Sequence, residues 1–173
     1  MNRSRRTFLA AGTFGALALS AAGWLRLRPA QRVAGRGLDS ASSGIVRAMT
    51  PAFLAGALPV DAGARATAVD ETVANVDAAI AGLSPDAQAE LAQLFALLGF
   101  APARIALAGL THDWTDATTD DVNAALERWR TSRVALLRSA YDGLHQLVLA
   151  AWYGNPRTWD AIGYPGPPRL TSA

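Results

Sequence analysis

The clearest folding signal in this chain is the stretch VDETVANVDAAIAGL, residues 69–83. Its apolar side chains recur at spacings of 4, 3, 4 and 3 residues: Val69, Val73, Val76, Ile80 and Leu83. These spacings place all five on one stripe of an α-helix. The opposite face carries the polar residues Asp70, Asn75 and Asp77. The stretch therefore predicts an amphipathic helix whose apolar stripe packs against a core.

The residues that follow this stretch predict two more helical segments. Ser84 can accept a hydrogen bond from the free amides of a first helical turn, and Pro85 at the first position loses no bond there. We expect this helix to run to about Leu98 and to stop at Gly99. A short segment, residues 104–110, follows after Pro102.

The residues before the stretch predict a further helix over residues 39–58, capped by Asp39 or Ser40. Pro51 lies inside it. Because proline lacks an N–H and its ring clashes with the preceding turn, we expect a break or kink at Thr50.

Two helices are expected in the C-terminal half. Thr119 or Asp120 can cap the first, and the second carries apolar residues at near-heptad spacing from Val134 to Trp152. Thr131-Ser132 fits either a break between them or a continuous helix. No segment shows sustained strand alternation. The prediction is an all-α fold of five or six helices, packed as a bundle or an irregular helical array.

The composition limits the chemistry that this chain can perform. Of the 173 residues, 51% are hydrophobic, and none is Cys. Disulfides, thiolate metal sites, covalent haem attachment, a Cys nucleophile and a lipoprotein anchor are therefore excluded. The chain also lacks a Gly-x-Gly-x-x-Gly motif opening a βαβ unit and a P-loop, so it is not expected to bind FAD, NAD or ATP by a standard fold.

Charge is distributed unevenly along the chain. All 16 basic residues are Arg; seven lie in residues 1–36, and all 14 acidic residues lie beyond them. The remaining chain has nine Arg against 14 acids, a net charge of −5. Nucleic-acid binding requires neutralisation of phosphates, so an acidic body of this kind argues against a nucleic-acid partner.

The N-terminus reads Ser4-Arg5-Arg6-Thr7-Phe8-Leu9 and is followed by an apolar run to Leu25. It resembles a twin-arginine signal peptide, with Arg5, Arg6, Phe8 and Leu9 as the signal residues, which implies export of a folded protein to the periplasm. A transmembrane helix and an ordinary secretory signal are the alternatives. Cleavage is left open, because Ala30 and Ala34 are weak cleavage sites. An uncleaved leader would associate the domain with the inner membrane.

Few residues are candidates for catalysis. Ser139, Asp142 and His145 lie three residues apart on one expected helix. A triad also needs a base oriented by a separate group and an oxyanion hole, so a solvated or capping set is the favoured interpretation. No catalytic residue is predicted.

An acidic cluster lies between two expected helices and comprises His112, Asp113, Asp116, Asp120 and Asp121. Its oxygen ligands could suit a hard cation such as calcium. The spacing matches no EF-hand, and Asp is also favoured at helix N-termini by the helix dipole. We favour the second interpretation and predict no metal site.

Four arginines precede or begin the last helix: Arg128, Arg130, Arg133 and Arg138. They fit carboxylate pairs across an interface or pairs with acids of the same chain equally well.

The C-terminal tail, residues 154–173, is rich in Pro, Gly and aromatic residues and cannot continue the preceding helix. Aromatic residues anchor interfaces, and proline reduces the entropy that a segment loses on docking. We therefore expect the following residues to bind a partner: Trp152, Tyr153, Trp159, Tyr164 and Pro165. The alternative is a tail that covers its own bundle. The expected organisation is a leader (1–36), a helical domain (37–153) and a docking tail (154–173).

Three segments together resemble a known family: the leader at Ser4–Leu9, the helix start at Leu83-Ser84-Pro85, and the closing AWYG, residues 151–154, with WDAIGYPGPP, residues 159–168. The chain resembles the small subunits of bacterial FAD-dependent sorbitol and fructose dehydrogenases, and the related gluconate 2-dehydrogenase subunit 3.

The resemblance implies a partner, a large flavoprotein of the glucose–methanol–choline (GMC) oxidoreductase type, with a cytochrome c subunit as a further component. The large subunit would hold FAD and oxidise a sugar or another alcohol, whereas this chain would hold no cofactor. The small subunit would stabilise this partner and carry it to the twin-arginine translocase. The expected function is that of a non-catalytic, chaperone-like subunit.

Two other functions remain open on the sequence. A stand-alone exported helical domain, with a binding or structural role, would purify as a monomer without a flavoprotein. A small enzyme that uses the cluster around His112 would purify with a bound metal.

Overall fold

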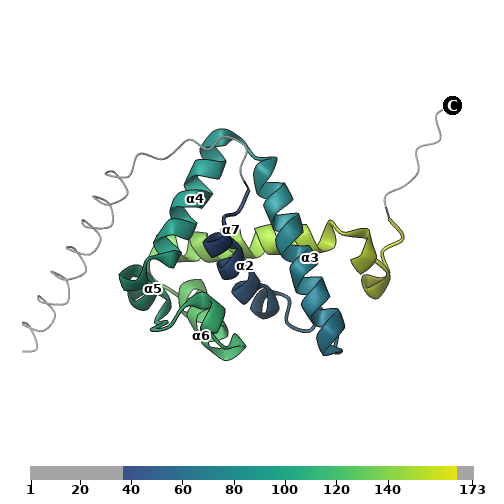
Figure 1. Ribbon diagram of the computed structural model, residues 1–173, viewed down its shortest axis with the longest axis horizontal. Helices are drawn as coiled ribbons and strands as arrows, with labels where there is room; N and C mark the ends of the chain where they lie inside the picture. The colour runs from purple at the N-terminus through teal and green to yellow at the C-terminus, as the bar shows by residue number, and fades with distance from the viewer. Residues whose placement is uncertain (1–36, 167–173) are drawn as a thin grey trace, which may run out of the picture.

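The computed structural model describes residues 37–166, apart from the side chain of Ala161. This part of the chain contains no strand, and its helices confirm the predicted all-α class with five to six helices (Figure 1). The α-helices are α2 (Ser40–Phe53), α3 (Ala62–Ala81), α4 (Pro85–Gly99), α5 (Ala101–Ala108), α6 (Thr119–Arg130) and α7 (Ala135–Tyr153). Three short 3-10 turns are η1 (Trp114–Asp116), η2 (Pro156–Thr158) and η3 (Asp160–Ile162). The leader residues Arg5, Arg6, Phe8 and Leu9 lie outside the described range.

Helix α2 lies at the centre of the array and contacts α3, α4, α6 and α7. Helix α7 crosses behind it and also packs on α3 and α6 (Figure 1). The buried side of α2 carries Ile45, Val46 and Met49. Full burial of an aliphatic side chain of this size contributes about 1.5–3 kcal/mol, so α2 is the element around which the core is assembled.

Of the break or kink predicted at Thr50, the break is wrong, because α2 continues through Pro51 to Phe53. Pro51 lacks the N–H that would donate to the Arg47 carbonyl, and α2 continues for only two residues beyond it. The hydroxyl of Thr50 donates to the Val46 carbonyl at 2.8 Å, and the Leu54 N–H donates to the Thr50 carbonyl at 2.9 Å. The helix is also shorter than the predicted 39–58, and Asp39 is its cap.

The amphipathic stripe on α3 is confirmed for four of its five residues. Val69, Val73, Val76 and Ile80 are buried. Leu83 is exposed, because α3 ends at Ala81 and the chain turns before it. The stripe therefore packs α3 onto α2 and α7, while its last predicted member is left outside the core.

Helix α4 begins as predicted, with Ser84 as cap and Pro85 at the first position. It ends at Gly99, and the extended Phe100 leads directly into α5. The axes of α4 and α5 meet at 86°. Within residues 37–166, no helix alone is long and apolar enough to cross a membrane, and only this bent pair taken together reaches that threshold.

The connection between α5 and α6 is fixed by a buried arginine. The Arg104 side chain is buried, and its Nε donates to the Leu110 carbonyl at 3.4 Å. Its Nη1 lies 3.1 Å from Oδ2 of Asp113. A buried guanidinium requires such partners, so this arginine positions the start of the acidic cluster.

Two buried tryptophans join α4, α5 and α6. The indole N–H of Trp114 donates to the Leu98 carbonyl at 2.9 Å, and that of Trp129 donates to the Leu107 carbonyl at 2.8 Å. The two rings meet edge to face, with centroids 6.4 Å apart. Each tryptophan is only 1% exposed. The pair therefore forms a dense part of the core with its polar atoms satisfied.

Helix α6 begins with a capping box. Its cap is Thr118, one residue before the predicted Thr119 or Asp120. The Thr118 hydroxyl bonds to the Asp121 carboxylate at 2.6 Å, and the Thr118 N–H donates to the same carboxylate at 3.1 Å. These bonds lower the pKa of Asp121 below its ordinary value. Helix α6 ends at Arg130 and α7 begins at Ala135. Of the two alternatives at Thr131-Ser132, the break between helices is therefore confirmed and the continuous helix is wrong.

Candidate docking surface at the C-terminus

The chain leaves α7 through two successive 3-10 turns. Asn155 starts the first turn: its side chain accepts a bond from the Arg157 N–H, and Pro156 follows at the first helical position. The buried Thr158 closes the turn, because its hydroxyl donates to the Trp152 carbonyl at 3.0 Å. The segment after α7 is therefore folded back against the end of the helix.

This first turn is also attached to α3. The Asn155 side-chain amide donates to the Glu71 carboxylate at 3.3 Å, and the Arg157 guanidinium pairs with the same carboxylate. One helical turn further along α3, the Asn75 side chain donates to the Ala151 carbonyl at 3.3 Å. These contacts join residues that are 76 to 86 positions apart, so they fix where the C-terminal segment leaves the bundle.

The aromatic residues beyond this attachment contact one another. The rings of Trp159 and Tyr164 meet edge to face, with centroids 5.2 Å apart, and the Trp159 indole N–H donates to the Tyr153 carbonyl at 2.7 Å. The left-handed Gly163, with φ +67°, allows the chain to turn so that the Tyr164 N–H reaches the Trp159 carbonyl at 3.0 Å. These contacts hold Trp159 and Tyr164 together at the end of α7.

Its apolar side chains are nevertheless open to solvent. Ile162 is 54% exposed, Tyr164 44% and Tyr153 41%, and Pro165 is exposed as well. We name these residues, with the half-buried Trp159, the C-terminal aromatic surface. Figure 1 shows the segment that carries it extending past α3 from the end of α7. Such a cluster of large apolar side chains on a monomer is typical of an interaction site.

Four of the five expected docking residues belong to this surface, and Trp152 does not. Trp152 is 8% exposed and forms part of the core. It continues the buried side of α7 that carries Leu144 and Val148, and Tyr153 follows it about 100° further around the helix. Ile162 was not predicted as a docking residue. Its only sequence signal is an apolar side chain between two aromatic ones.

The acidic cluster is used in structural contacts. Asp113 caps η1 and pairs with Arg104, and Asp121 belongs to the capping box of α6. His112 lies near Asp121, with Nε2 and Oδ2 3.7 Å apart. Among residues 37–166, no group of three or more His, Asp or Glu side chains is placed to hold a metal ion. The contacts agree with the favoured interpretation of this cluster as helix caps.

Ser139 and His145, two of the three residues considered as a triad, line different cavities beside α7. Ser139 lines a groove between α4 and α7, whereas His145 lines a pocket between α2, α6 and α7. The Tyr141 and His145 rings stack with centroids 5.5 Å apart, and the Phe53 ring lies 5.3 Å from that of His145. His145 is therefore packed among aromatic rings and is not aligned with Ser139.

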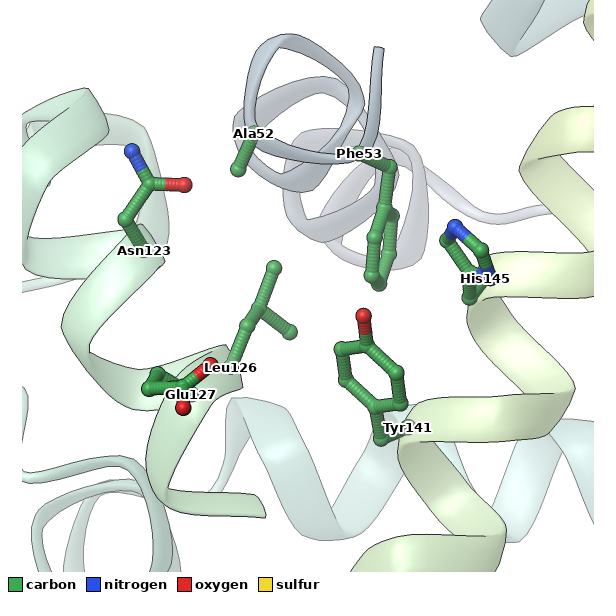
Figure 2. A pocket seen from close by; sticks show the side chains of 7 residues that line it. All are labelled: Ala52, Phe53, Asn123, Leu126, Glu127, Tyr141 and His145. Carbon is green, nitrogen blue, oxygen red and sulfur yellow. The ribbon is translucent and has the colours of Figure 1, made fainter. Parts of the chain in front are cut away.

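The pocket beside His145 is small, with a volume of about 130 Å³. Figure 2 shows the Tyr141 hydroxyl directed into the space between Phe53 and Leu126, with Asn123 and Glu127 on the α6 side. Glu127 forms a two-bond pair with Arg130 at 2.9 and 2.8 Å, which lowers the pKa of this carboxyl group and raises that of the guanidinium. Both carboxylate oxygens of Glu127 are therefore engaged by Arg130 of the same helix.

Three of the four arginines near the α6–α7 break bond to groups of the same chain. Arg128 donates to the Ala108 carbonyl and to the Ala124 carbonyl, Arg130 pairs with Glu127, and Arg138 donates to the Ser132 carbonyl at 2.6 Å. These bonds favour the local interpretation of the arginine cluster.

Comparison with known protein families, with curated proteins and with solved structures finds no match for this chain.

Proposed function

We propose that this chain is a non-catalytic small subunit that escorts a periplasmic FAD-dependent alcohol or sugar dehydrogenase through the twin-arginine pathway and stabilises it. The observation that carries the proposal is the C-terminal aromatic surface, a set of exposed apolar side chains on a segment that is anchored to the bundle. Surfaces of this type bind protein partners, because buried aromatic anchors supply most of the binding energy in an interface.

The anchoring of this segment supports a docking role. The contacts of Asn155 and Arg157 with Glu71 order the backbone before any partner arrives. A segment that is already ordered loses less conformational entropy on binding. The exposed side chains of Tyr153, Ile162 and Tyr164 can then contribute apolar burial with little opposing cost.

The other support comes from the two ends of the sequence. The leader with Arg5 and Arg6 resembles a signal for the export of folded cargo. The closing motif at residues 159–168 resembles that of small subunits whose partner is a GMC-type flavoprotein. In this proposal the partner holds FAD and performs the oxidation, a cytochrome c subunit accepts electrons, and this chain supplies the signal and a stabilising surface.

The escort role is tested by replacing Arg5 and Arg6 together with Lys and fractionating the native host. We expect both this chain and the flavoprotein to remain in the cytoplasm, measured by immunoblotting and by flavin absorbance of each fraction. The matched control is Arg3→Lys, which changes an arginine of the same leader outside the pair. Export of the flavoprotein at the wild-type level in the double variant would contradict the proposal.

One observation favours a second function, that of a stand-alone exported helical domain. The tail also bonds to its own helix, through Thr158 to the Trp152 carbonyl and Trp159 to the Tyr153 carbonyl. A tail that only closes the end of α7 needs no partner. This alternative predicts a colourless monomer when the chain is purified from its host.

A further inference from the structure

A second apolar surface lies between α4 and the part of α7 that carries residues 139–147. Helix α4 packs mainly on α2 and α5, and α7 packs mainly on α3 and α6. They leave a groove with a volume of about 500 Å³. Its apolar walls are Leu83, Leu91 and Leu94 on the α4 side and Leu144 and Leu147 on α7. We name this hollow the α4–α7 groove. A groove with leucine walls suits an apolar helix.

One end of the α4–α7 groove is acidic. Glu90 lines the groove. Asp86 lies four residues earlier, in the first turn of α4, and residues at this spacing share a helix face. Neither carboxylate belongs to any of the five ion pairs found in residues 37–166. The acidic end coincides with the end lined by Leu83. The groove therefore fits an apolar helix with basic residues at one end.

We propose that the occupant is the apolar run of this chain's own leader, residues 8–25, before export. An α-helix rises about 1.5 Å per residue, so the run would form a helix roughly 27 Å long, against roughly 22 Å for α4. The run can therefore cover the whole groove. Basic residues flank the run on both sides: Arg3, Arg5 and Arg6 precede it, and Arg26, Arg28 and Arg32 follow it. The three that follow complement Asp86 and Glu90.

The entry point of the chain makes this placement reachable. The Leu38 N–H donates to the carboxylate of Asp77 on α3, less than two helical turns before Leu83 at the acidic end of the groove. Residues 26–36 connect the run to this point, and a connection of this length can span roughly 36 Å when extended. The length of the connection therefore allows the run to reach the groove.

The orientation that needs the shorter connection has the C-terminal end of the run at the Leu83 end of the groove. In this orientation Leu25 lies near Ala87, with the arginines that follow beside Asp86 and Glu90, and the run is antiparallel to α4. Arg5 and Arg6 then lie beyond the far end of the groove. The signal residues are left accessible to the translocase while the apolar run is shielded from water until export.

The absence of Cys from the chain allows a direct test by disulfide formation in the full-length precursor. The pair Leu25→Cys and Ala87→Cys should form an intramolecular disulfide, and so should Ala18→Cys with Leu94→Cys, seven residues further along both helices. Each pair should crosslink about tenfold more than the exchanged pairs Ala18 with Ala87 and Leu25 with Leu94, because a disulfide needs Cα atoms within about 7 Å. Circular dichroism verifies that each variant folds.

The precursor for this test is purified from a host that lacks the translocase, so that the leader is intact. Equal crosslinking of the matched and exchanged pairs would overturn the proposal. Disulfides between two chains would also overturn it and would identify a second copy as the occupant. A readout that does not depend on a disulfide is thiol labelling of Leu91→Cys. Adding Leu17→Glu, which places a charge in the run, should raise its labelling rate about tenfold by driving the run out of the groove; an unchanged rate would count against the proposal.

Discussion

Two aromatic pairs in this chain use the same contacts in different surroundings. Trp114 with Trp129, and Trp159 with Tyr164, both meet edge to face, and all three indole N–H groups donate to backbone carbonyls. Each tryptophan of the first pair is 1% exposed, and this pair joins three helices. The second pair lies outside the core, and its indole N–H donates to the Tyr153 carbonyl at the end of α7. The same chemistry therefore stabilises the fold in one place and leaves an apolar surface for a partner in the other.

The largest effect is expected inside the core pair. Trp129→Ala removes a fully buried ring and leaves the Leu107 carbonyl without its donor. Loss of a buried aromatic side chain costs about 3–5 kcal/mol. Denaturant unfolding followed by circular dichroism measures this loss, and a change below about 1 kcal/mol, the usual range for surface substitutions, would show that the pair does not hold the three helices together.

A smaller effect on stability is expected at the buried Arg104. Arg104→Met keeps most of the aliphatic volume but removes the donors to the Leu110 carbonyl and Asp113. Leaving a buried acceptor without a partner costs about 1–3 kcal/mol. The same unfolding measurement tests this, with Arg65→Met, an exposed arginine on α3, as the matched control. Equal stability of the two variants would contradict the positioning role of Arg104.

The capping box of α6 provides the next smaller effect. Thr118→Ala removes the hydroxyl that accepts from the Asp121 N–H. Loss of such a cap costs about 1 kcal/mol. Thr131→Ala, an exposed threonine at the other end of α6, is the control. A Thr118 variant as stable as this control would mean that tertiary contacts alone define where α6 starts.

The capping box of α6 also predicts how the stability of the fold depends on pH. The pKa of Asp121 is lowered first by the Thr118 hydroxyl and then by the Thr118 N–H. A carboxyl group with a lowered pKa in the folded state stabilises the fold above its unfolded value and loses this contribution as the pH falls through the folded value. The stability difference between wild type and Thr118→Ala should therefore be constant above the ordinary value of 3.8 and shrink below it. A difference that grows on acidification would contradict the assignment.

The smallest effect on stability is expected in the exposed pair. Tyr164→Ala should change the unfolding free energy by roughly 0.5 kcal/mol, as is usual for a surface substitution. A loss as large as that of Trp129→Ala would show that the tail is part of the fold and closes its own bundle. The unfolding curves of the two variants, measured side by side, make this comparison directly.

The fold was predictable where local patterns control it. The spacing of Val69, Val73, Val76 and Ile80 identified the buried side of α3, and Ser84-Pro85 identified the start of α4. The break considered at Thr50 was wrong, because α2 tolerates Pro51 and ends two residues after it. Local patterns give the type of an element more reliably than its ends.

The candidate site was less predictable, because its geometry depends on distant residues. The attachment of Asn155 and Arg157 to Glu71 joins positions 84 and 86 residues apart, and no local pattern contains it. Trp152 and Tyr153 are adjacent and both aromatic, yet one is in the core and the other is exposed. The near-heptad spacing of α7 already placed Trp152 on the buried side, and that signal outweighs its membership of an aromatic tail.

The central claim is that the C-terminal aromatic surface binds a flavoprotein and contributes little to the fold. It is tested most directly by affinity purification of the full chain from its native host, as wild type, as Tyr164→Ala and as the control Val60→Ala, which changes an exposed residue outside the tail. We predict a yellow complex with flavin absorbance and one large co-purifying chain for wild type and Val60→Ala. We predict loss of the large chain from Tyr164→Ala at unchanged thermal stability. A colourless single chain in all three preparations would contradict the account.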